Sequence, residues 1–198
     1  MSELGVLLLG LGLGLRHATD ADHVVVVSAL VQREQSVWRA ARVAALWGVG
    51  HTVAFLALGL LVVVAGVRLP ESFERAAEVV VGLMLLGLGA WHLARGGEAD
   101  ASSASAAAAR PVFIGVVHGL AGSAGVALLA ATTLGSRALA VGYLGLVALG
   151  TVVGMVALTV AMSRPIQWTM GRPGAWRRAA VVLPAVLGIA LGLHVLVG

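Results

Sequence analysis

The stretch that decides the fold is GLRHATDADHVVVV, from Gly14 to Val27, which lies within an otherwise apolar segment over residues 4–30. About 20 apolar residues suffice for a helix to cross a bilayer, so this segment is long enough to do so. It nevertheless carries one arginine, two histidines and two aspartates. A charged side chain near the bilayer centre costs roughly 2.5–3.5 kcal/mol on insertion scales. Such a concentration of polar groups therefore indicates a functional site more than a structural ion pair.

The composition of the whole chain is typical of an integral membrane protein. Of its 198 residues, 60% are hydrophobic and 11% are charged, and its mean hydropathy is +1.00; soluble domains carry about 25% charged residues. The N-terminus lacks the basic region and cleavage site of a signal peptide, so we expect it to begin a retained helix. The apolar runs predict an all-α polytopic membrane protein with six transmembrane helices, at about residues 4–30, 43–66, 75–94, 111–133, 138–162 and 179–197.

Two absent residue types exclude several kinds of chemistry. Without cysteine the chain has no disulfides, no thiolate metal ligands and no dithiol for electron transfer. Without lysine it has no Schiff base. No phosphate-binding motif of the form G-x-x-x-x-G-K-[ST] is present, so we do not expect ATP hydrolysis. We also expect that the protein is not an enzyme. The arginines cluster at helix ends, which indicates a role in topology rather than nucleic-acid binding.

The arginines also predict the orientation of the chain. Alternate loops on one side hold nine of them, and loops on the other side hold three. Because cytoplasmic loops are enriched in basic residues, we expect the arginine-rich side to be cytoplasmic and both termini to lie outside the cytoplasmic membrane. The nine are Arg33, Arg39, Arg42, Arg95, Arg110, Arg164, Arg172, Arg177 and Arg178, and the three are Arg68, Arg75 and Arg137.

A weak internal repeat occurs at an offset of about 101 residues. GLRHATDADH (Gly14–His23) aligns with GVVHGLAGSA (Gly115–Ala124), which places His17 over His118. Each half would contribute three spans, so the halves would insert with opposite orientations, the inverted-repeat plan of many secondary transporters. We therefore predict a first three-helix half over residues 1–98, an Ala/Ser-rich linker over 99–110 and a second three-helix half over 111–198.

Helical geometry divides the polar groups of the opening stretch. At 100° per residue, His17, Asp20 and His23 fall within about 120° of one face, whereas Asp22 points roughly opposite. Imidazole and carboxylate groups suit divalent ions such as Ni²⁺, Co²⁺ and Zn²⁺. On a straight helix His17 and His23 lie about 9 Å apart along the axis, so one ion could bind both only if the helix bends or unwinds. Arg16 would either neutralise an aspartate or anchor the bend.

Two further histidines are predicted to lie at the same depth as His17. His51 and His118 fall about 12 Å and 10 Å from the cytoplasmic edge, and His17 falls about 20 Å from the outer edge of a core about 30 Å thick. The alternative is that each forms a hydrogen bond across a helix interface, since their glycine and alanine neighbours allow close packing. His92 and His194 lie near helix ends and are expected to be interfacial.

These motifs resemble those of the nickel/cobalt transporter (NiCoT) permeases and their shorter urease-accessory-type relatives. RHATDADH (Arg16–His23) is similar to the family signature R-H-A-x-D-A-D-H, and GVGHTV (Gly48–Val53) to the glycine-histidine-hydroxyl motif of the following helix. HGLAGSAG (His118–Gly125) is similar to the fourth-helix motif of the short relatives. The resemblance implies uptake of Ni²⁺ or Co²⁺, with signature cation-site residues at His17, Asp22 and His23, Asp20 within the motif, and a contribution from His51.

We therefore expect a permease that takes up Ni²⁺ or Co²⁺ by alternating access, with the metal ion as its substrate and no cofactor. The expected partners are the ion, the lipid bilayer and either a second copy of the chain or nickel-enzyme maturation proteins. Two alternatives stay open: a metal or small-solute exporter of the same fold, and a non-transporting membrane subunit or metal sensor. The predicted site comprises His17, Asp20, Asp22, His23, His51 and His118, with supporting candidates at Arg16, Thr52 and Ser123.

Overall fold

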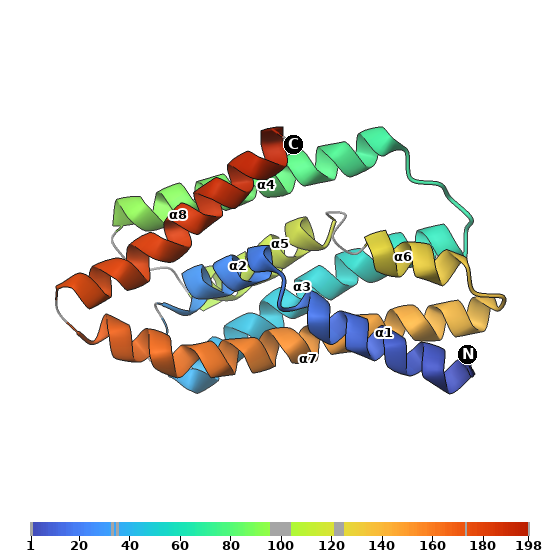
Figure 1. Ribbon diagram of the computed structural model, residues 1–198, viewed down its shortest axis with the longest axis horizontal. Helices are drawn as coiled ribbons and strands as arrows, with labels where there is room; N and C mark the ends of the chain where they lie inside the picture. The colour runs from blue at the N-terminus through green and yellow to red at the C-terminus, as the bar shows by residue number, and fades with distance from the viewer. Residues whose placement is uncertain are drawn as a thin grey trace.

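The protein is a helical membrane protein. The computed structural model describes residues 2–32, 34, 36–95, 104–120, 125–172 and 174–197, and its regular secondary structure there is α-helical. Figure 1 shows the helices lying roughly along one long axis. They are α1 (Glu3–His17), α2 (Ala21–Val31), α3 (Val37–Val63), α4 (Glu71–Arg95), α5 (Ala104–Gly119), α6 (Gly125–Thr132), α7 (Arg137–Met170) and α8 (Ala175–Val197).

Four of these helices, α3, α4, α7 and α8, are long and apolar enough to cross a membrane. The other two predicted spans are each divided into a pair of shorter helices. The first predicted span, residues 4–30, corresponds to α1, with 15 residues, and α2, with 11. The span predicted over residues 111–133 corresponds to the later part of α5, whose 16 residues begin at Ala104, and to α6, with 8. The structure therefore supports the helical membrane class, while the count of six spans stays a prediction. The break in the first run falls at its polar groups, as the expected bend between His17 and His23 requires. In the second run α5 ends at Gly119, and residues 121–124, which precede α6, lie outside the described part of the chain.

Two predicted boundaries also differ from the structure. α7 continues past the predicted end at residue 162 and includes Pro165. Pro165 cannot donate the usual backbone hydrogen bond, but the next residue, Ile166, packs against a buried apolar cluster and so favours continuation of the helix. The predicted linker over residues 99–110 overlaps α5, which begins at Ala104.

Glycines allow the central helices to pack with their backbones in close contact. α1 packs mainly along α7, α5 along α3, and α4 along α8, while α3 and α7 also pack against each other. A Cβ atom at Gly14 would lie 2.1 Å from the carbonyl oxygen of Val147, and one at Gly115 would lie 2.1 Å from that of Trp47. Small residues at such positions are how membrane helices reach close van der Waals contact.

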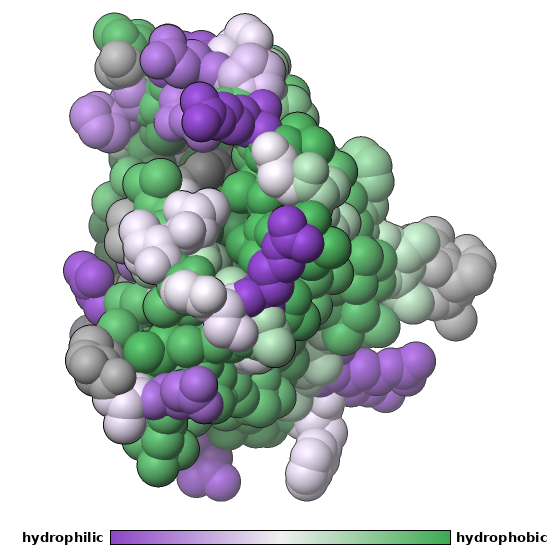
Figure 2. Space-filling model, turned by 90° about the vertical axis from the view of Figure 1, so that its right-hand side faces the viewer, coloured by the Kyte–Doolittle hydropathy of each residue, from purple (hydrophilic) through white to green (hydrophobic). Residues whose placement is uncertain are grey.

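The surface of the protein is suited to lipid. Phe113 is 69% exposed, Leu183 is 61% exposed and Val53 is 58% exposed. Figure 2, which looks onto the end where α4 begins, shows a largely hydrophobic surface with hydrophilic side chains gathered along its upper edge. Such extensive exposed apolar area is unfavourable in water and favourable in a bilayer. The interior, in contrast, contains the buried histidines described next.

Candidate metal centre

The break between α1 and α2 brings two histidines together. α1 ends at His17, and Asp20 at the start of α2 adopts an extended conformation with φ −62° and ψ 150°. The turn is held by backbone hydrogen bonds, and the Thr19 hydroxyl donates to the Arg16 carbonyl oxygen at 2.6 Å. The ring centroids of His17 and His23 consequently lie 4.5 Å apart. On a straight helix one ion could not bind both His17 and His23, and the break between α1 and α2 removes this obstacle.

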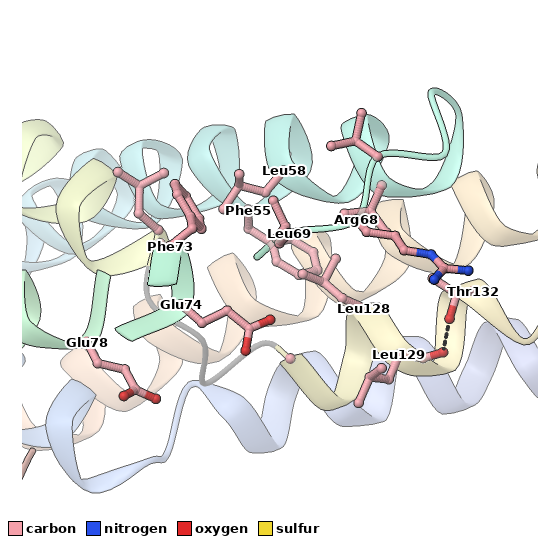
Figure 3. Close-up of a pocket in the computed structure, with 15 residues that line it drawn as sticks. Phe55, Leu58, Arg68, Leu69, Phe73, Glu74, Glu78, Leu128, Leu129 and Thr132 are labelled. Carbon is pink, nitrogen blue, oxygen red and sulfur yellow. Dashed lines mark hydrogen bonds between the residues drawn. The ribbon is translucent and has the colours of Figure 1, made fainter. Parts of the chain in front are cut away.

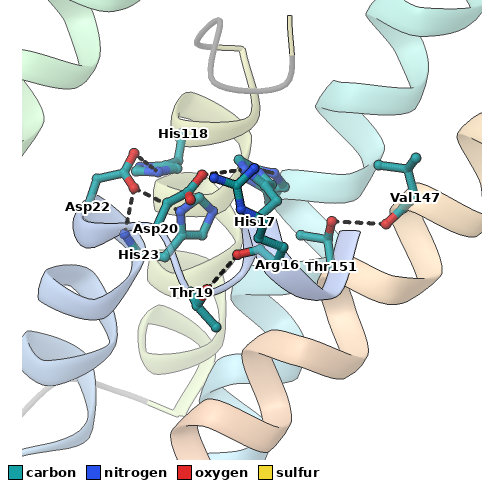
Figure 4. Close-up of polar contacts among 10 residues, drawn as sticks. Arg16, His17, Thr19, Asp20, Asp22, His23, His118, Val147 and Thr151 are labelled. Carbon is teal, nitrogen blue, oxygen red and sulfur yellow. Dashed lines mark hydrogen bonds and ion pairs between the residues drawn. The ribbon is translucent and has the colours of Figure 1, made fainter. Parts of the chain in front are cut away.

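Two aspartates hold these imidazoles in place (Figure 4). Asp20 Oδ2 lies 2.9 Å from His17 Nδ1, and Asp22 Oδ1 lies 3.0 Å from His23 Nδ1. Asp22 Oδ1 also accepts a hydrogen bond from the backbone N–H of His23 at 2.9 Å. An imidazole that donates its Nδ1–H to a carboxylate keeps a lone pair on Nε2, which is the tautomer that a metal ligand needs.

Two more histidines reach the same place from other helices. His51 on α3 places its Nε2 atom 3.3 Å from His17 Nε2, and His118 near the end of α5 places its Nε2 atom 3.1 Å from Asp22 Oδ2. His23 and His118 are fully buried, and His51 is 2% exposed. Four imidazoles and one carboxylate thus meet at the break in the first apolar segment.

The described residues contain two overlapping groups whose ligand atoms could surround a metal ion. The first comprises His17, His23 and His51, and the second comprises Asp22, His23 and His118; in each group the ligand atoms lie within 4.8 Å of one another. His23 Nε2, His51 Nδ1 and His118 Nδ1 are buried and form no hydrogen bond to a described residue. Buried polar atoms usually have a partner, so these nitrogens leave coordination capacity unused.

The two aspartates and the other predicted residues differ in how closely they approach this cluster. The expectation that Asp22 points away is wrong, because the break reorients α2 and directs Asp22 toward His23 and His118. Asp20 is peripheral, with a side chain 42% exposed. Arg16 is exposed and forms no ion pair with either aspartate in the described structure. Thr52 buries its hydroxyl oxygen without a described hydrogen-bond partner, and Ser123 lies outside the described residues.

Two curated proteins resemble this chain over different lengths. The urease accessory protein UreH of Bacillus sp. (strain TB-90) is 28% identical over 206 aligned residues, which cover 96% of this chain and 90% of that protein. The high-affinity nickel transport protein of Cupriavidus necator is 34% identical over 84 residues, which cover 41% of this chain and 24% of that protein. These similarities support the resemblance to the NiCoT permeases and their urease-accessory-type relatives that the motifs indicate.

Two further comparisons return no match for this chain. No family model matches it, and no solved structure matches it. The two curated relatives are transport or accessory proteins rather than enzymes, in agreement with the prediction of a non-enzymatic membrane protein.

Trp47 also belongs to the site, although it was not among the residues predicted from the sequence. Its side chain is fully buried, and its ring centroid lies 5.4 Å from that of His23 and 6.0 Å from that of His118. Trp47 precedes His51 by four residues, so the two share a face of α3. That spacing is a signal that could have identified it as a wall of the histidine cluster.

His92 was predicted to be interfacial, and this prediction is wrong. The residue is fully buried, and its Nε2 atom is hydrogen-bonded to the side-chain oxygen of Gln32 at the end of α2. The Gln32 side-chain nitrogen in turn donates to the carbonyl oxygen of Ala180 on α8. Gln32 therefore connects α2, α4 and α8 through buried hydrogen bonds. His194 is exposed, as expected.

Replacement of Gln32 by methionine should destabilise the protein without weakening metal binding. The side chain keeps its approximate volume but leaves the Ala180 carbonyl without this donor and His92 without this acceptor, at about 1–3 kcal/mol per buried group. Thermal unfolding in detergent would measure the loss. Gln167→Met is the matched control, because Gln167 is only partly buried and its side chain donates to the carbonyl oxygen of Glu34 alone among the described residues. An equal loss in both variants would contradict this account.

Proposed function

We propose that this protein is a permease that takes up Ni²⁺, and also Co²⁺, across the cytoplasmic membrane. The observation that carries the proposal is the convergence of His17, His23 and His51 on one buried point beside a break in an apolar segment. Transporter sites commonly lie near the bilayer midplane at such discontinuous helices. The names of the two relatives, a urease accessory protein and a nickel transport protein, support nickel as the substrate.

The three imidazoles are suited to first-row divalent ions. Metal–imidazole bonds are about 2.0–2.1 Å long, so two nitrogens on one ion lie at most about 4.2 Å apart. The ligand atoms of His17, His23 and His51 lie within 4.8 Å, and a contraction of well under 1 Å would bring every pair within that limit. In this proposal Asp20 and Asp22 orient His17 and His23 through their Nδ1–H groups, as carboxylates behind metal-bound histidines do.

The second group offers the ion a neighbouring position. Asp22 and His118 lie on the other side of His23, which belongs to both groups. An ion could therefore exchange ligands around His23 without regaining its full hydration shell. A stepwise exchange of this kind keeps binding strong enough for selection and weak enough for release.

We further propose that the chain crosses the membrane six times, with α1–α2 and α5–α6 each acting as one broken span. Figure 1 supports an inverted arrangement, because α1–α2 runs from right to left and α5–α6 from left to right. The packing supports it as well, since α1 lies along α7 as α5 lies along α3. In this view, residues 1–98 and 111–198 form two halves that move against each other during alternating access.

Two close backbone contacts, one formed by each predicted half, support the same inverted arrangement. A Cβ atom at Gly50 would lie 2.2 Å from the carbonyl oxygen of Val112, and one at Gly150 would lie 2.4 Å from that of Leu11. The numbers of corresponding residues in these two contacts differ by 100 and 101, close to the offset of the sequence repeat. Equivalent contacts in both halves are what a pseudo-twofold axis would produce.

The proposed direction is inward, with both termini outside. The arginine distribution supports this orientation. A divalent cation that moves into a negative interior gains about 4.6 kcal/mol at 100 mV, so the membrane potential could drive uptake without ATP. On the cytoplasmic side, the name of the urease accessory relative suggests that the ion is passed to proteins that mature nickel enzymes.

Metal flux in membrane vesicles of known sidedness tests this function. Right-side-out vesicles with a negative interior should accumulate Ni²⁺, whereas vesicles that carry the double variant His17→Ala, His118→Ala should match vesicles without the protein. Flux only out of the cytoplasmic side would identify an exporter. Binding of Ni²⁺ by the purified protein without flux in either direction would favour a sensor or a non-transporting subunit.

A further inference from the structure

We propose that a cavity at the α3–α4 end of the molecule is an outward-facing, water-filled vestibule through which a hydrated divalent cation reaches the histidines. This inference rests on the proposed function. The cavity has a volume of about 640 Å³ and lies between the end of α3, the start of α4, and α6 (Figure 3). Six waters occupy about 180 Å³ at about 30 Å³ each, so an ion with its first hydration shell fits with room to spare.

The inner wall of the cavity adjoins the histidine cluster directly. Gly119 lines the cavity and follows His118 in the chain. It also packs against α3, since a Cβ atom at Gly119 would lie 2.3 Å from the carbonyl oxygen of His51. Phe55, which lines the cavity from α3, is one helical turn beyond His51. Among the described residues, the wall is therefore made by the immediate neighbours of two of the histidines.

The outer part of the cavity carries the charge that would attract a cation. Glu74 and Glu78 line it from α4, and Figure 3 shows the Glu74 carboxylate extending toward α6 across the cavity. Glu78 is held 3.5 Å from Arg75, whereas Arg68 lines the opposite part of the rim, near Thr132. The lining thus carries two carboxylates, both on α4, and one guanidinium. An excess of negative charge at the mouth of a low-dielectric cavity raises the local concentration of cations.

The position of the cavity agrees with entry from outside. It opens beside the segment between α3 and α4, which the arginine distribution places on the outer side. Figure 2 shows hydrophilic side chains along the upper edge of this end, where α4 begins. An ion attracted there would pass Glu74, lose water against the wall formed by Gly119, and meet His51 and His118.

The absence of cysteine from the chain allows a direct test by single-cysteine labelling. Leu128→Cys places a thiol in the cavity wall, whereas Phe113→Cys places one on the exposed apolar surface away from the cavity. A membrane-impermeant maleimide applied to the outside of intact cells should label the first variant and not the second. Labelling of Leu128→Cys only by a lipid-soluble maleimide would show a lipid-filled crevice, and labelling only from the cytoplasmic side would show the opposite opening; either result overturns the proposal.

The role of the carboxylates is tested by Ni²⁺ uptake at two ionic strengths. The double variant Glu74→Gln, Glu78→Gln should raise the KM for Ni²⁺ uptake about 10-fold in dilute buffer and leave kcat unchanged. The difference in KM should vanish near 1 M salt, because the Debye length is then only about 3 Å and the carboxylates no longer attract a distant ion. Glu71→Gln is the matched control, since Glu71 lies on the same helix but outside the cavity lining. An equal effect of Glu71→Gln, or an effect that salt leaves unchanged, overturns steering by these two groups.

The two readouts separate this proposal from the permease proposal. Labelling does not require transport. If the cavity is labelled but the protein moves no Ni²⁺, the proposal of a permease is contradicted, whereas the water-filled cavity is supported. Uptake of Ni²⁺ with the cavity closed to the impermeant reagent would retain the permease and refute the vestibule.

Discussion

Replacement of His23 by alanine is expected to abolish high-affinity binding of Ni²⁺ to the purified protein. His23 is the only residue shared by the two ligand groups found in the described part of the chain, so its loss leaves neither complete. Loss of a group behind a metal ligand already costs about 10–100-fold in affinity, and loss of this ligand should cost at least about 100-fold. Isothermal titration of the detergent-solubilised protein with Ni²⁺ would measure it.

A second buried histidine provides the control for His23. His92 is equally buried but is bonded to Gln32 and belongs to neither ligand group. His92→Ala should therefore lower thermal stability and leave the affinity for Ni²⁺ unchanged. If both variants lose binding to the same extent, the loss reflects general destabilisation. Retained binding in His23→Ala would refute the metal site itself.

The two aspartates are expected to differ in the same titration. Asp22→Asn removes a carboxylate that contacts both His23 and His118, and it should weaken Ni²⁺ binding by about 10–100-fold. Asp20→Asn should have a smaller effect, because the Asp20 side chain is 42% exposed and water can replace its contact with His17. The reverse order would contradict the arrangement of the site.

The helical membrane class and the grouping of the histidines were predictable for simple reasons. Long apolar runs require a bilayer, and buried polar groups within them require one another. The break near His17 was also predictable, since one ion cannot bridge His17 and His23 on a straight helix. The inward direction of Asp22 was not, because it depends on the extended conformation of Asp20, which helical periodicity cannot represent.

The burial of His92 could not be predicted from local sequence either. Its partner, Gln32, lies 60 residues earlier in the chain. Its position in the sequence put His92 near the end of a predicted helix, where an interfacial side chain is expected. The residue is buried because α2 packs between α4 and α8. The break between α5 and α6 was missed for a related reason, because an apolar run with glycines is equally typical of a continuous, closely packed membrane helix.

Replacement of Gly115 by alanine should destabilise the fold and disturb the metal site together. The added Cβ atom would lie 2.1 Å from the Trp47 carbonyl oxygen and 2.8 Å from the His51 backbone nitrogen. Both neighbours are backbone atoms of α3, so the clash can be relieved only if α3 and α5 move apart. Overpacking of this kind typically costs about 1–3 kcal/mol. We expect a lower Tm in detergent and weaker Ni²⁺ binding, since the movement separates His51 from His118.

Gly14→Ala should separate the effect of a disturbed helix contact on stability from the effect of disturbing the helices that carry His51 and His118. Its Cβ atom would meet the Val147 carbonyl oxygen at 2.1 Å and the Thr151 backbone nitrogen at 2.8 Å, the same distances as at Gly115, but in the contact between α1 and α7. A similar fall in Tm is therefore expected, with a smaller loss of Ni²⁺ affinity because α7 supplies no ligand to either group. Gly12→Ala and Gly145→Ala on the same two helices meet nothing within 4 Å and should leave Tm unchanged or slightly raised, since alanine favours a helix over glycine by about 1 kcal/mol. Loss of stability in these controls would show that glycine itself, rather than the close helix contact, is what the fold requires.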